Sequence, residues 1–191
     1  MSNQGLPPLA SEGVFTASTS ITIDAPRNTV WNVLMDWGSY HEWNPFVRNQ
    51  CIADASKKPL PASQQTPRAG AHLLIHPVHI PPSFDPPEIF PASSGFVIIT
   101  TMDSDNYRCA WNTVGYPSWL LTTERWQTLV EVVEDGRKKT RYESIEVFGG
   151  LLAYLIRIFA GSGLQAGFSA MAEGLKKRPP ANPDTATEST I

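Results

Sequence analysis

Residues 95–149 form an unbroken run of strand-like segments, and this run most limits the folds open to the chain. Apolar and polar residues alternate over 95–104, 107–114, 120–134 and 138–150, as in half-buried strands. Asp135–Gly136 has the composition of a hairpin turn. Strands joined by such short turns pair antiparallel. The run therefore predicts an antiparallel sheet.

Helical patterns flank this run on both sides. Leu164, Phe168, Met171 and Leu175 are spaced by four, three and four, which predicts a long closing helix from Leu151 to about Lys177. Ahead of the run we expect strands at 14–25, 46–54 and 70–80, a helix from about Pro26 to Asp36 and a short second helix at 40–44. Proline interrupts the loops at 54–69 and 79–94.

This order of elements indicates an α+β fold, with helices on one face of an antiparallel sheet of six to seven strands. A strongly curved sheet wrapped on one helix leaves a hollow, where a ligand site is expected. We expect residues 1–13 to be a flexible terminus, 14–178 to be a single domain and the polar segment 179–191 to be a disordered tail.

Composition narrows the classes of partner. With 41% hydrophobic and 17% charged residues, the chain has the composition of an ordinary globular protein. Its net charge of −3 and the lack of a basic block argue against a nucleic-acid partner. The apolar run that ends at Arg157 is shorter than the roughly 20 residues of a membrane span, so we expect no integral membrane association. The two cysteines do not have the spacing of a disulfide framework, and the sequence shows no secretory signal pattern. We therefore expect the protein in the cytoplasm.

Several stretches match a known family. "ITIDAPRNTVWNVLMDWGSYHEWNPFV" at 21–47, "ERWQTL" at 124–129, "GRKKTRYESIEVFGGLL" at 136–152 and "GFSAMAEGLKKR" at 167–178 resemble the START-like, polyketide cyclase/dehydrase (SRPBCC, helix-grip) superfamily. The resemblance covers roughly residues 15–178 and implies a helix-grip fold with an interior cavity. The superfamily includes lipid carriers, hormone receptors and cyclases. The proline-rich loops are longer than the family pattern and lie where such folds have the cavity mouth.

The residues alone leave open which side of the last hairpin faces inward. A two-residue turn sets Arg125 opposite Glu146, whereas a three-residue turn sets Trp126 there. The resemblance implies that Tyr142, Ser144, Glu146 and Phe148 face inward, and we expect Trp126 to join them. Trp43, on the second helix, belongs either to the core or to the pocket entrance. The expected ligand-binding residues are Trp43, Cys109, Trp111, Trp126, Tyr142, Ser144, Phe148, Leu164, Phe168 and Met171.

Three residues are candidates for acid–base chemistry. A carboxylate in an apolar hollow has a raised pKa, which suits Glu146 to a general acid or base. The alternative is a charge that pairs with Arg125 or faces water. Glu124 is a second carboxylate on the neighbouring strand, and His41 lies beside the expected entrance.

Metal and cofactor chemistry has weaker support. His72, His76 and His79 are close in sequence, but no cysteine or carboxylate near them completes a tetrahedral set of metal ligands. We therefore expect no metal site. Cys109 has no evident base partner and suits a small core residue better than a nucleophile. No phosphate-binding glycine loop occurs, and no cofactor is expected. The glycines of "AGSG" at 160–163 indicate either a hinge in the closing helix or close packing on the sheet.

Three functions fit these features. The first is a binding protein that encloses an apolar small molecule, polyketide- or lipid-like. The second is an enzyme of the cyclase/dehydratase type, in which the same cavity positions a reactive chain and a carboxyl group transfers a proton. The third is an interaction protein whose interior is filled by its own side chains.

Overall fold

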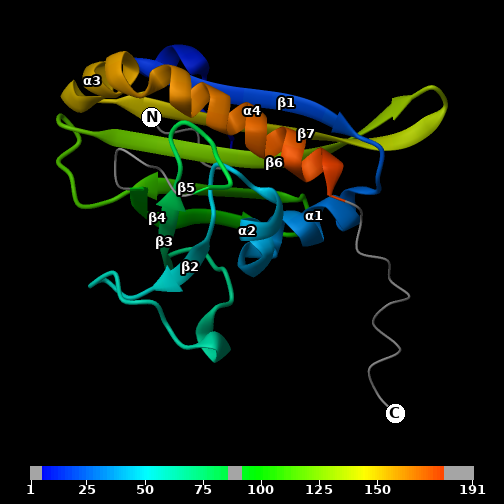
Figure 1. Ribbon diagram of the computed structural model, residues 1–191, viewed down its shortest axis with the longest axis horizontal. Coiled ribbons are helices and arrows are strands. Elements are labelled where there is room, and N and C mark those ends of the chain that lie inside the picture. The colour runs from blue at the N-terminus through cyan, green and yellow to red at the C-terminus, as the bar shows by residue number, and fades with distance from the viewer. Residues whose placement is uncertain (1–5, 86–91, 179–191) are drawn as a thin grey trace.

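A single curved sheet of seven strands forms the frame of the protein (Figure 1). The computed structural model describes residues 6–85 and 92–178. Neighbouring strands all pair antiparallel, in the order β1-β7-β6-β5-β4-β3-β2. The strands are β1 (Phe15–Ile23), β2 (Gln50–Ala53), β3 (His72–Val78), β4 (Ser93–Asp103), β5 (Arg108–Thr113), β6 (Thr122–Glu134) and β7 (Arg137–Gly149).

Four α-helices accompany the sheet: α1 (Arg27–Met35), α2 (Tyr40–Trp43), α3 (Leu151–Phe159) and α4 (Gly161–Lys177). Short 3-10 turns occur at Ala10–Glu12, Trp37–Ser39 and Ala62–Gln64. This arrangement confirms the predicted α+β helix-grip fold. The expected tail at 179–191, part of the expected flexible terminus and residues 86–91 of the proline-rich loop lie outside the described residues.

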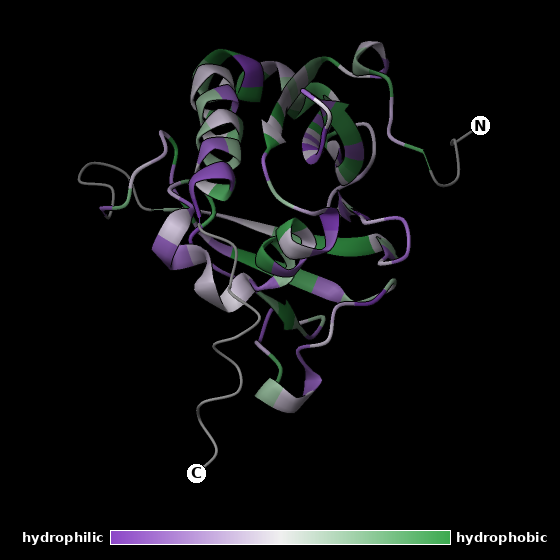
Figure 2. Cartoon of the chain, turned by 90° about the vertical axis from the view of Figure 1, so that its right-hand side faces the viewer, coloured by the Kyte–Doolittle hydropathy of each residue, from purple (hydrophilic) through white to green (hydrophobic). Residues whose placement is uncertain are grey.

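The core lies between the inner face of the sheet and the helices. Helix α4 runs along β1 (Figure 1) and buries Phe168 and Met171 against the sheet. Helix α1 adds the buried Leu34 and also Trp31, whose ring meets Tyr107 edge-on at 5.9 Å between centroids. In the side view of Figure 2 the central strands are mostly coloured as apolar. Burial of these large side chains, rather than helix propensity, holds the helices on the sheet.

The predicted closing helix is two helices. Helices α3 and α4 meet at Ala160 with a bend of 73°. Just past the bend, a Cβ on Gly163 would come within 2.6 Å of Ile80 Cγ2, so the glycine permits close packing against the loop after β3. Among the described helices, none is long and apolar enough by itself to cross a membrane; α3 and α4 meet that criterion only as this bent pair.

The last hairpin has the two-residue turn. Asp135 and Gly136 have φ values of 53° and 72°, both positive, as in the type I′ turn that joins twisted strands. Glu134 therefore pairs with Arg137, and Arg125 lies opposite Glu146. The prediction that Trp126 faces inward is wrong, because residues directly opposite each other share a face of the sheet.

Candidate functional site

A cavity of about 410 Å³ lies inside the curve of the sheet. We call it the inner cavity. Strands β3 to β7 form one side of its wall, and α3, the start of α4 and the adjacent loops form the other. Its lining residues are Phe46, Val47, Lys57, Leu74, Ile75, Val78, Ile80, Ser93, Ser94, Gly95, Phe96, Val97, Trp111, Thr113, Val114, Tyr116, Leu121, Thr123, Arg125, Glu146, Phe148, Ile156, Ala160 and Leu164.

Most residues in the wall of the inner cavity are aliphatic or aromatic, and about a third carry polar or charged side chains. This composition and size are those of sites for small apolar molecules. The protein's own side chains leave this space open, unlike the filled interior considered as the third possibility.

Arg125 and Glu146 bring opposite charges to this apolar wall. They face each other across β6 and β7, yet no ion pair joins them in the described part of the chain. Arg125 is 4% exposed, and its Cζ lies 4.2 Å from the centre of the Phe168 ring. The rings of Trp111 and Phe46 are farther, at 5.8 and 6.0 Å. The guanidinium is therefore held mainly by aromatic faces.

The hydrogen bonds of Arg125 leave donors unused. Its Nη2 donates to Met171 Sδ over 3.4 Å, and sulfur is a weak acceptor. Its Nε is buried and has no acceptor among the described residues. Burial of a charged donor without an acceptor costs free energy, so an oxygen acceptor inside the cavity would stabilise this group.

Glu146 keeps some solvent contact through the cavity but is surrounded by protein atoms. Burial raises the pKa of its carboxyl group, while the Arg125 charge and then the Thr123 hydroxyl act in the opposite direction. Desolvation dominates because the carboxylate loses water without gaining an ion pair. A raised pKa extends to higher pH the range over which this carboxyl group can donate a hydrogen bond or a proton.

Beneath the cavity, a buried polar chain fixes the sheet's inner face. Tyr142 Oη donates to Gln127 Oε1 over 2.7 Å, and Gln127 Nε2 donates to Cys109 Sγ over 3.9 Å. Burial raises the pKa of the Cys109 thiol to about 12, against the opposing effects of Arg125 and Gln127. The thiol stays protonated at neutral pH, so Cys109 does not act as a nucleophile in this state.

The predicted ligand-binding residues divide into three groups. Trp111, Phe148 and Leu164 line the inner cavity, as does the candidate acid Glu146. Another group is buried on the same side of the sheet but outside the lining: Cys109, Tyr142, Ser144, Phe168 and Met171. Phe168 and Met171 act on the cavity indirectly, through their contacts with Arg125.

Trp126 and Glu124 lie on the opposite face of the sheet. Trp126 Nε1 donates to Glu124 Oε1 over 2.7 Å there, so the candidate Glu124 does not share the inner face with Glu146. His41 is exposed on α2, its Nδ1 is 2.8 Å from the Gly38 carbonyl oxygen, and it lines neither the inner cavity nor the groove described next.

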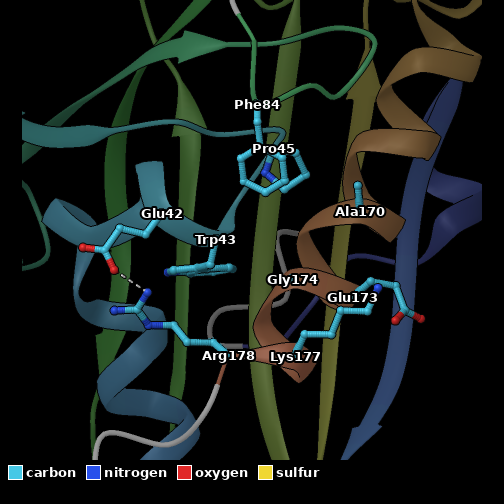
Figure 3. A pocket seen from close by; sticks show the side chains of 9 residues that line it. All are labelled: Glu42, Trp43, Pro45, Phe84, Ala170, Glu173, Gly174, Lys177 and Arg178. Atoms are coloured by element: carbon cyan, nitrogen blue, oxygen red, sulfur yellow. Dashed lines mark hydrogen bonds and ion pairs between the residues drawn. The ribbon is translucent and has the colours of Figure 1, made fainter.

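Trp43 borders a second, more open hollow between α2 and the end of α4 (Figure 3). This outer groove has a volume of about 580 Å³ and is lined by Glu42, Trp43, Pro45, Phe84, Ala170, Glu173, Gly174, Lys177 and Arg178. Arg178 Nη1 and Glu42 Oε2 form an ion pair of 2.7 Å on its side. The described lining of the groove contains no buried charged side chain, whereas Arg125 is buried in the wall of the inner cavity, so the inner cavity is the stronger candidate site.

The three neighbouring histidines do not converge. His72 stacks on Phe96, with 5.2 Å between ring centres, and the Nδ1 of His79 lies 2.7 Å from the Ser83 carbonyl oxygen. Within residues 6–85 and 92–178, no group of three or more histidine, cysteine or acidic side chains could hold a metal ion.

Comparisons with known proteins agree with this architecture. A START superfamily protein from Mycobacterium smegmatis aligns with 84% of this chain and 94% of its own, at 14% identity and a TM-score of 0.52. The chain has a START-like fold. A point mutant of norcoclaurine synthase from Thalictrum flavum, solved with a transition-state analogue, aligns with 85% of this START-like chain and 91% of its own, at 10% identity and a TM-score of 0.53.

One curated protein is similar in sequence over nearly the whole START-like chain. It is oxopyrrolidines biosynthesis cluster protein O of Penicillium oxalicum, 29% identical over 192 residues, which span 92% of this chain and 90% of that protein. No protein-family model matches the chain.

Sequence reasoning missed several wall residues of this START-like cavity, above all Arg125. The two-residue turn at Asp135–Gly136 was the available signal, because it alone sets Arg125 on the inner face. Ile80 and Tyr116 come from irregular loops whose path no periodicity predicts.

Proposed function

We propose that the protein binds an apolar small molecule, polyketide- or lipid-like, in the inner cavity. The observation that carries this proposal is an apolar hollow of about 410 Å³ at the centre of the fold. The relative from an oxopyrrolidines biosynthesis cluster supports a ligand that belongs to small-molecule biosynthesis. Both cysteines are free thiols, which supports the cytoplasm as the proposed location.

The proposal can be tested with N-phenyl-1-naphthylamine, a neutral apolar dye whose fluorescence rises on leaving water. We expect the purified protein to bind the dye and a competing lipid to displace it. Mass spectrometry of organic molecules that co-purify with the protein would identify the ligand class directly. A well-folded protein that takes up no dye would contradict the proposal.

A cavity-filling variant makes the test site-specific. Gly95 lies in β4 directly opposite Ile75, and a Cβ built on it would approach Ile75 at 3.7 Å, an ordinary contact. Gly95→Leu should therefore fit the fold while its added side chain occupies the cavity, and we expect at least about tenfold weaker dye binding. Ser20→Leu, on exposed β1, adds the same side chain away from the cavity and should bind normally.

A second candidate function is a cyclase or dehydratase reaction. The observation that favours it is the position of the Glu146 carboxyl group in the cavity wall, where burial raises its pKa, as suits a general acid. Glu146→Gln should then abolish turnover of a bound substrate while its affinity stays within a few-fold. Unchanged turnover would remove Glu146 from this role.

A further inference from the structure

Arg125 is the one cationic side chain that is buried in the described wall of the inner cavity. The other cation on that wall, Lys57, is exposed. A guanidinium carries its charge at all physiological pH values and presents five donors in a planar fork. Its position on a central strand, opposite both Trp111 and Glu146, fixes that fork within the fold.

The protein itself leaves part of this fork without an acceptor, although Arg125 also interacts with the hydroxyl group of Tyr142. Arg125 Nε has no acceptor in the described part of the chain, and Nη2 donates to a thioether. The Phe168 ring, at 4.2 Å, stabilises the charge from one side without accepting a conventional hydrogen bond. Glu146 lies opposite and forms no ion pair with it.

We infer that the ligand of the inner cavity is an apolar molecule with one acidic oxygen group, a carboxylate or an enolate, which binds to Arg125. This inference rests on the proposed binding function and narrows its ligand class. A purely hydrocarbon-like ligand would leave the buried donors of Arg125 without an acceptor, whereas an anionic oxygen supplies one and also neutralises the buried charge. The apolar wall encloses the rest of the molecule.

The distribution of charge explains why an anion fits this cavity. Glu146 is the only acidic residue in its described lining, and burial raises the pKa of its carboxyl group. The ligand oxygen therefore meets the fixed positive charge of Arg125, while burial makes a competing negative charge at Glu146 less favourable. The two groups are complementary to a single acidic oxygen group held between β6 and β7.

Two dyes that share one ring system test this inference. 8-Anilinonaphthalene-1-sulfonate carries a sulfonate anion, and N-phenyl-1-naphthylamine is the same molecule without it. We expect the wild-type protein to bind the anionic dye about 10- to 100-fold more tightly, the range of a charge-assisted hydrogen bond. Equal affinities, or tighter binding of the neutral dye, would overturn the inference and leave the proposed function standing.

Substitution of each cation on the cavity wall tests whether Arg125 causes the preference for the anionic dye. Arg125→Met keeps a long side chain and should lose the preference for the anionic dye while it still binds the neutral one. Lys57→Met removes the exposed cation of the same wall and should keep the preference. If Arg125→Met does not fold, Arg125→Lys retains the charge without the planar fork and should bind the anionic dye more weakly than the wild type.

Two further outcomes are decisive. If the preference survives in Arg125→Met, or if Lys57→Met loses it, the anion binds elsewhere and the inference is wrong. If the wild-type protein binds neither dye, the proposed function fails and the inference fails with it.

Discussion

Replacing Glu146 with glutamine should stabilise the folded protein at pH 8 and change its stability little at pH 4. The folded-state pKa of Glu146 is raised above its unfolded value of about 4.3. The stability that this group contributes is therefore fully present below the unfolded pKa and is lost as pH rises through the folded pKa. Glutamine does not ionise and avoids that loss.

The size of the effect follows from linkage. Each unit by which the pKa is raised removes about 1.4 kcal/mol of wild-type stability once the carboxyl group is ionised in both states. For a chain of this size, 1 kcal/mol shifts the melting temperature by about 2–4 °C. We therefore expect Glu146→Gln to gain about 3–5 °C at pH 8 for each such unit. The positive charges of Arg125 and Lys57 on the same wall act against this gain.

The assay is thermal unfolding at pH 4, 6 and 8, followed by circular dichroism. Ser144→Ala is the matched control, because Ser144 is two residues away on the same face of β7 and does not titrate. Its difference from the wild type should be the same at every pH. If the difference between Glu146→Gln and the wild type also stays constant, or shrinks as pH rises, desolvation of Glu146 is not what we describe.

Two further predictions address packing and strand register. Gly167→Ala places a Cβ 2.4 Å from Cδ2 of the buried Phe46 ring, so overpacking of about 1–3 kcal/mol should exceed the roughly 1 kcal/mol gain in helix propensity. Urea unfolding measures the net loss in the free energy of unfolding. A gain of about 1 kcal/mol would mean that the Phe46 ring moves aside without cost. Trp111→Leu should change the affinity for N-phenyl-1-naphthylamine several-fold, and Trp126→Leu on the outer face should not. The opposite result would contradict the register of β6.

The strands were predictable because alternation is a local property. All seven expected strands occur, with ends shifted by up to four residues, as at β2, where the chain at 46–49 is not yet in the strand. There the side chain of Asn44 accepts hydrogen bonds from the backbone N–H groups of Phe46 and Val47, and Val47 contacts the sheet only through an isolated bridge to Val78.

The resemblance implies the inward face of β7, and the length of the turn decides which face of β6 joins it. An Asp-Gly pair favours a two-residue type I′ turn, and the positive φ angles of Asp135 and Gly136 conform to it. A one-residue difference in turn length moves every side chain of a strand to the other face. The residues of the turn therefore indicate which face of the sheet Arg125 and Trp126 occupy.

Residue spacing alone predicts neither the bend at Ala160 nor the path of the loops that line the inner cavity. The apolar stripe of α4 continues the helical spacing, and nothing in that period marks a change of axis. Just past the bend, Gly163 packs closely against Ile80, which is far from it in the sequence. Tertiary packing of this kind overrides local propensity.

Helix α3 is the most weakly held part of the cavity wall. Of its nine residues only Ala153 is buried, whereas Ile158 and Phe159 are 71% and 83% exposed, and backbone hydrogen bonds to Trp119 and Leu120 secure its first turn. Segments with so few buried contacts open locally at a free energy below that of global unfolding. Displacement of this one short helix would widen the cavity for a guest molecule without breaking the seven-stranded sheet.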